Sequence, residues 1–151
     1  MRVNKPSPEQ YAYAGLDIPE TWDMMAQDIL TGWSTGLPHA VIEYTRSLEN
    51  QCLQAGIMQA VHNSLLASGH FGEVDIKVRA CGYDHALVAG KPDDFIHVTI
   101  YLLSGRTPDI KKQLTVGVLE TLQGLDLRAA SITVDARDMD RAIYSKTRYG
   151  T

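Results

Sequence analysis

The sequence predicts an α/β (α+β) fold in which two βαβ units form a mostly parallel four-stranded sheet with two helices on one face. Apolar residues recur at helical spacing in segments 48–69 and 105–124, and each segment lies between two stretches with strand character. A long helix between two strands favours a right-handed crossover to a parallel neighbour. The two passages, at about 38–81 and 95–136, have similar lengths, which indicates an internal duplication.

Residues 1–36 are predicted to form an N-terminal extension with one short helix, ahead of a domain at 37–151. Pro19 suits the first helical position, and Glu20 and Asp23 suit the positive end of a helix dipole. The segment carries one apolar stripe: Trp22, Met25, Ile29 and Trp33. We expect this stripe to dock on a partner surface.

The first unit begins with a predicted strand at 38–44, PHAVIEY, and Ser47 is a plausible N-cap for the helix that follows. That helix is expected to run to Gly69 with this apolar set: Leu48, Cys52, Leu53, Ile57, Val61, Leu65 and Leu66. Segment 74–82 alternates as a strand should. Val74, Ile76, Val78 and Ala80 are expected on one face, and Asp75, Lys77 and Arg79 on the other.

The second unit follows a loop or hairpin at 83–94 and begins with a strand at 94–105. Thr107 is a good N-cap and Pro108 a good first residue for the next helix, which Gly124 should end. Its predicted buried stripe is Ile110, Leu114, Val118 and Leu122. The last strand is expected at 129–137, and the short polar tail offers Ile143 and Tyr144 as anchors.

Composition excludes several classes of function. The formal net charge of −4 provides no general basic field for nucleic acid or acidic lipid. No apolar run approaches a membrane span, and no apolar segment follows Arg2 and Lys5, so we expect a cytoplasmic protein without a secretory signal. The 2 cysteines lack CxxC spacing and the 5 histidines lack HxH or HExxH spacing, so a metal site is not expected.

Three cations are candidates for binding an acidic ligand. Lys77 and Arg79 share one face of a predicted strand, and Arg106 lies between a strand end and a helix start. Arginine binds carboxylates through two parallel hydrogen bonds, so these groups could converge on an acidic ligand if the two units pack side by side. The alternative is that they are solvent-facing charges or ion-pair partners of Asp and Glu.

Candidate bases lie at the start of the first strand. Pro38 is the first residue of the predicted strand, where a proline removes no hydrogen bond from the interior of the sheet. Its presence there therefore has a purely structural explanation. His39 and Glu43 could act as general bases, although such residues are more often structural or surface groups. His97 is more simply explained as a packed, hydrogen-bonded histidine.

The stretches PHAVIEY, GHF, IKVRA, FIHVTIYLLSGRT and KKQLTVGVLETL together resemble the 5-carboxymethyl-2-hydroxymuconate isomerase family of the tautomerase superfamily, whose simplest relative is 4-oxalocrotonate tautomerase. The resemblance covers about 37–147. It implies two βαβ units per chain, a homotrimer, and no metal or cofactor. The implied activity is a 1,3-proton shift from enol to ketone on an unsaturated dicarboxylate such as 5-carboxymethyl-2-hydroxymuconate, in the breakdown of aromatic compounds.

The resemblance also implies roles for single residues. Pro38 would be the general base and acid, and Arg79 and Arg106 would bind substrate carboxylates or polarise the carbonyl. Lys77 and His39 would belong to the substrate-binding set. This chain departs from the family because Leu37 precedes the proline. The nitrogen of an internal proline is an amide and is not basic.

Three explanations of this departure stay open. In the first, the active chain begins at Pro38, through initiation at a leucine codon for Leu37 or through proteolysis. A divergent relative would use another base, with His39 or Glu43 as the first candidates. A non-catalytic relative would pack the extension over the pocket or across a trimer interface, through Trp22, Ile29 and Trp33.

Overall fold

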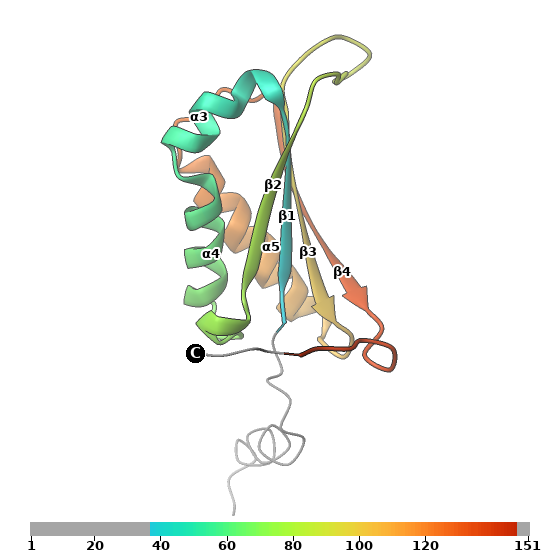
Figure 1. The fold of residues 1–151 in the computed structure, drawn as a ribbon. Helices are drawn as coiled ribbons and strands as arrows, with labels where there is room; N and C mark the ends of the chain where they lie inside the picture. The colour runs from blue at the N-terminus through green and yellow to red at the C-terminus, as the bar shows by residue number, and fades with distance from the viewer. Residues whose placement is uncertain (1–36, 148–151) are drawn as a thin grey trace, which may run out of the picture. The chain divides into compact units, whose positions relative to one another are not determined.

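The computed structural model describes residues 37–147, which form a four-stranded sheet with its helices on one face (Figure 1). The helix predicted within 1–36 lies outside the described residues. The elements, in chain order, are β1 (His39–Thr45), η1 (Arg46–Leu48), α3 (Glu49–Gln54), α4 (Ile57–Ala67), η2 (Glu73–Asp75), β2 (Lys77–Tyr83), β3 (Phe95–Leu103), α5 (Pro108–Gln123) and β4 (Ser131–Met139).

The strands lie in the order β2-β1-β3-β4. β1 pairs in parallel with β2, with His39 opposite Lys77, and β3 pairs in parallel with β4. The central pair, β1 with β3, is antiparallel and places His39 opposite Tyr101. Each βαβ unit therefore contributes one parallel pair, and the predicted mostly parallel sheet of two units is confirmed.

The core lies between the sheet and the helices. Alternate residues of β1 and β3 point to the helices, so their other residues point to the opposite face. The fully buried core side chains include Ile42, Val61, Leu65, Ile96, Val98, Ile100, Leu102, Val118 and Leu122. No helix of the described segment covers the opposite face, which we call the open face (Figure 1).

The prediction of one continuous helix over 48–69 is wrong, because the structure has two shorter helices there. These are α3 and α4, separated at Gly56, whose backbone is left-handed with φ 61. The change of direction still buries Cys52, Ile57, Val61 and Leu65, but it leaves Leu53 65% exposed. Ser47 does not act as the predicted N-cap either, because it lies inside η1 and its hydroxyl donates to the Asp94 carboxylate.

The predicted strand over 74–82 begins later than expected. Residues Glu73–Asp75 form a 3₁₀ turn, and β2 starts at Lys77. Val74 is 65% exposed and Asp75 is 4% exposed, the reverse of an apolar-in pattern. The Asp75 carboxylate is buried because Lys146 pairs with it at 3.0 Å.

The start of α5 agrees with the prediction and fixes one side of the candidate site. The Thr107 side chain accepts a hydrogen bond from the Ile110 N–H at 3.4 Å, and Pro108 is the first helical residue. Arg106 is therefore held between the end of β3 and this helix. Of the two predicted tail anchors, Tyr144 contacts His39 at 3.1 Å, whereas Ile143 is 80% exposed.

Candidate active site

The candidate site lies where β1 starts and β3 ends. Pro38 is buried directly before β1, and its carbonyl accepts the Lys77 N–H at 3.0 Å. The antiparallel pairing of β1 with β3 brings the end of β3 and the following turn to this same edge. The parallel partners add the start of β2 and the end of β4, so all four strands contribute a terminus to this end of the sheet, with β2 and β3 next to β1.

A cationic group lies on the open face. Lys77 is the cross-strand neighbour of His39, and Arg79 lies two residues further along β2, opposite Val41. The His39 pKa is lowered below 6.5, first by burial and then by the positive charges of Lys77 and Arg79. The His39 ring nitrogen Nε2 lies 3.1 Å from the Tyr144 hydroxyl. This environment favours a neutral, hydrogen-bonded imidazole beside two cations.

Arg106 lies at the same end of the sheet as Pro38, on the turn between β3 and α5. Its guanidinium sits 5.0 Å from the centre of the Phe71 ring, and its Nη1 donates to the Leu103 carbonyl at 3.2 Å. Burial lowers the pKa of Arg106 and the charge of Arg141 lowers it further, while Asp138 acts in the opposite direction. A partly desolvated guanidinium of this kind interacts strongly with an anion that reaches it.

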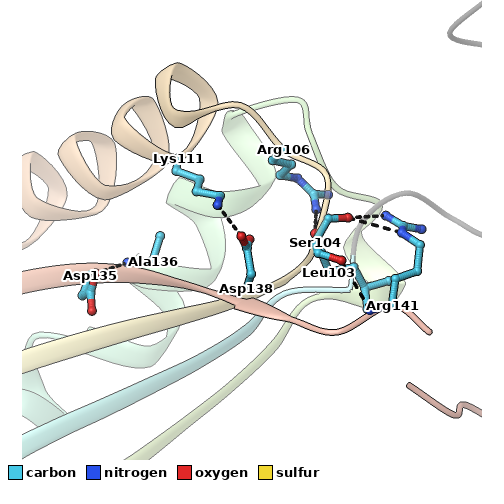
Figure 2. A network of polar contacts seen from close by, with 8 residues as sticks. All are labelled: Leu103, Ser104, Arg106, Lys111, Asp135, Ala136, Asp138 and Arg141. Carbon is cyan, nitrogen blue, oxygen red and sulfur yellow. Dashed lines mark hydrogen bonds and ion pairs between the residues drawn. The ribbon is translucent and has the colours of Figure 1, made fainter. Parts of the chain in front are cut away.

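Arg141 is a neighbour of Arg106 that sequence reasoning missed (Figure 2). Its Nε and Nη2 donate to the Ser104 carbonyl at 3.3 and 3.2 Å, and its backbone N–H donates to the Ser104 hydroxyl at 3.4 Å. The predicted parallel pairing of the two strands of the second unit was the signal that could have indicated Arg141. β3 and β4 are parallel, so the residues after both strands reach the same edge.

Within one chain the predicted site residues fall into two groups. Alternation along β1 places Pro38 on the same side as Ala40, which faces the helices. His39, Lys77 and Arg79 instead belong to the open face. Arg106 belongs to the turn at the end of β3, so the sheet separates it from Arg79.

Glu43, the other candidate base, lies further along the open face. It is opposite His97 on β3, and its carboxylate accepts the Tyr83 hydroxyl. His97 itself contacts two threonine hydroxyls, those of Thr133 at 2.7 Å and Thr99 at 3.0 Å, as expected of a packed, hydrogen-bonded histidine. Neither Glu43 nor His97 lies at the edge that holds Pro38.

A cavity of about 270 Å³ borders the open-face group. Its lining residues are Val74, Asp75, Lys77, Tyr144, Ser145, Lys146 and Thr147. Two lysines give it a cationic wall, although Lys146 is already paired with the Asp75 carboxylate.

Across residues 37–147, no group of three or more His, Cys, Asp or Glu side chains could hold a metal ion. No helix in that same range combines the length and apolarity needed to cross a bilayer.

Comparison with known protein families adds to this geometry. A family model described as 5-carboxymethyl-2-hydroxymuconate isomerase matches residues 38–131 and so begins at Pro38. No curated protein sequence matches the chain.

Solved structures agree with the fold. One is a crystal structure of a 5-carboxymethyl-2-hydroxymuconate isomerase from Deinococcus radiodurans R1, at 21% identity and a TM-score of 0.63, covering 76% of this chain and 92% of that one. Another, of a 5-carboxymethyl-2-hydroxymuconate delta-isomerase, has 14% identity, a TM-score of 0.57 and coverages of 77% and 90%. A fused 4-OT described as a symmetric trimer has 18% identity, a TM-score of 0.58 and coverages of 68% and 87%. At these identities the likeness establishes the fold.

Proposed function

The chain belongs to the 5-carboxymethyl-2-hydroxymuconate isomerase family, and on this premise we propose that it catalyses a 1,3-proton shift on an unsaturated dicarboxylate when Pro38 is its first residue. Family membership supports an isomerase or tautomerase function. The observation that carries the finer proposal is that the family match starts at Pro38. That residue is buried at the edge where β1 starts, next to Lys77.

The proposed reaction needs a base that can also return a proton. The secondary amine of an N-terminal Pro38 has a lone pair, and cations near it disfavour its protonated form and lower its pKa toward neutrality. The amine would accept the proton of the substrate's enol O–H and, once protonated, deliver a proton to the carbon next to the enol carbon, which completes the 1,3-shift. The product is the ketone, and no oxidant, reductant or leaving group is involved.

Arg106 is the proposed electrostatic partner of this base. During the proton shift, negative charge develops on the substrate oxygen, and a donor held in place beforehand stabilises that charge most effectively. Arg106 is held by the Leu103 carbonyl and by the face of Phe71, so its guanidinium is oriented before substrate arrives. Its partial burial strengthens the interaction.

Lys77, His39 and Arg79 are proposed to bind substrate carboxylates from the open face. In a single chain they are separated from Arg106 by the sheet. We propose that the protein is a homotrimer in which neighbouring subunits cover the open faces and complete each site. The uncovered sheet face supports this assembly, as does the likeness to a fused 4-OT described as a trimer. Sedimentation equilibrium tests the assembly, and a monomeric mass would contradict it.

A second candidate is a non-catalytic or divergent trimeric member of the family whose pocket is covered by the N-terminal extension. The observation that favours it is Leu37, which is 1% exposed. The residue that blocks the Pro38 nitrogen is therefore packed into the protein. A divergent enzyme would need another base, and the depressed pKa of His39 keeps its imidazole neutral and able to accept a proton.

The deciding experiment compares chains 1–151 and 38–151 on a dienol dicarboxylate, following the enol absorbance. N-terminal mass measurement first verifies that Pro38 is the first residue of the shorter chain. We expect activity only in the shorter chain, and Pro38→Ala there should lower kcat by about 10²-fold. Pro92→Ala in the exposed loop is the matched control and should leave kcat unchanged.

Each other outcome has a definite meaning. If both chains are inactive and Pro38→Ala changes nothing, the enzyme proposal fails and the non-catalytic candidate stands. If the full chain is active and His39→Gln abolishes that activity, the divergent enzyme is correct. The mass of the N-terminus in protein from its native source then shows which chain exists in the cell.

A further inference from the structure

We propose that Arg141 and Arg106 together form a carboxylate-binding site on the Leu103–Ser104 turn, and that Arg141 selects ligands with a second carboxylate. The inference deepens the proposed function and rests on it for the identity of the substrate. Arg141 lies beyond residues 38–131, the part of the chain that the family model matches. It therefore adds a residue that the family comparison does not assign.

The geometry places two guanidinium groups on one short turn. Arg106 donates to the Leu103 carbonyl, and Arg141 donates to the next carbonyl along the chain, that of Ser104. The two side chains come from different elements, one before α5 and one after β4 (Figure 2). Consecutive carbonyls therefore hold two arginines on one turn, and arginine is the side chain best suited to binding a carboxylate through two hydrogen bonds.

The electrostatics of this pair favour an anion. Two like charges held together raise each other's energy, and the charge of Arg141 contributes to the lowered pKa of Arg106. The carboxylate of Asp138, whose charge acts on Arg106, is paired with Lys111 at 2.6 Å. Arg141 forms no ion pair with any residue in 37–147. A bound carboxylate would relieve the repulsion between the two guanidinium groups.

The position of the pair relative to Pro38 suits a ligand of several carbons. Continuing the β1–β3 register by one residue places Pro38 opposite Leu102, so the turn that holds both arginines begins next to it. Arg106 is half-buried and Arg141 is exposed. A ligand with two carboxylates could therefore place one on the exposed Arg141 and the other on the half-buried Arg106.

The test is the binding of two ligands with the same carbon skeleton to the full chain by isothermal titration calorimetry. Muconate is hexa-2,4-dienedioate, and sorbate is the corresponding acid with one carboxylate. We expect Arg141→Gln to weaken muconate binding about tenfold and to change sorbate binding less than twofold. The matched control is Arg128→Gln, which removes the same charge before β4, at the opposite end of that strand, and should change neither.

A second variant covers the case in which Arg141→Gln fails to fold, as judged by far-UV circular dichroism. Arg141→Lys keeps the charge but lacks the planar fork, so it cannot hold the Ser104 carbonyl and a carboxylate together. It should lose part of the muconate affinity and none of the sorbate affinity. Equal losses for the two ligands in either folded variant, or no muconate binding by the wild type, overturn the proposal.

The result is separable from the proposed function because muconate lacks the enol group and is not turned over. Arg141-dependent muconate binding in a protein whose 38–151 chain has no isomerase activity would refute the proposed reaction and leave the carboxylate site standing. Isomerase activity with an Arg141→Gln variant that keeps the wild-type preference for muconate over sorbate would refute the site and leave the reaction standing.

Discussion

One methyl group added at Gly56 and one added at Gly117 should change stability in opposite directions. A Cβ built on Gly56 meets nothing within 4 Å, so Gly56→Ala gains no packing contact. The left-handed backbone there, with φ 61, costs an L-residue about 1–2 kcal/mol. A Cβ on Gly117 lies 3.8 Å from the Ser64 hydroxyl, an ordinary contact, and the residue is inside α5. Alanine there should add about 0.5–1 kcal/mol, because glycine is the poorer helix former.

The two variants should therefore differ by about 2 kcal/mol in the free energy of unfolding. Urea unfolding followed by far-UV circular dichroism measures this, with protein concentration held fixed because assembly would change the apparent stability. A Gly56→Ala protein as stable as the wild type would show that α3 and α4 form one continuous helix, and the reasoning about the break would be refuted. A destabilised Gly117→Ala protein would mean that α4 and α5 are too close for a methyl group.

Three further predictions concern the site and its support. Arg106→Gln in the 38–151 chain should lower kcat by about 10²-fold, because the donor for the developing oxyanion is lost; an effect on KM alone contradicts the role. Thr107→Ala should cost about 1 kcal/mol in urea unfolding, and a cost near zero would mean that the Ile110 N–H does not need the Thr107 hydroxyl. The lowered pKa of His39 means that, below pH 6.5, the unfolded chain binds a proton that the folded chain does not. Stability should therefore fall as pH drops from 6.5 toward the lowered pKa, and His39→Gln should flatten that slope; an unchanged slope rejects the assignment.

The second βαβ unit could be predicted closely because its local signals agree with one another. Thr107, Pro108 and Gly124 mark the start and the end of α5, and the apolar stripe between them matches the buried face. The first unit contained a conflict that periodicity does not resolve. Gly56 lies inside an apolar-periodic segment, and a glycine there is compatible with either a continuous helix or a left-handed break.

The site was predictable to the extent that it depends on strand alternation. Lys77 and Arg79 share a face because they are two residues apart in a strand, and parallel pairing with β1 adds His39. Arg141 could not be found in this way, because it lies in a polar tail whose path depends on the Ser104 contacts. Asp75 was also misplaced, because the ion pair that buries it involves Lys146, 71 residues away in the chain.

The antiparallel pairing at the centre of the sheet relates the two βαβ units by an approximate twofold axis. Under that symmetry, the position before β1 corresponds to the position before β3, at the opposite end of the sheet. Asp93 and Asp94 stand there instead of a proline beside cations, and the Phe95 N–H is satisfied by the Thr45 hydroxyl at 3.0 Å. The duplication thus repeats the strands and helices of the first unit, but the residues directly before β3 are acidic where a proline stands before β1.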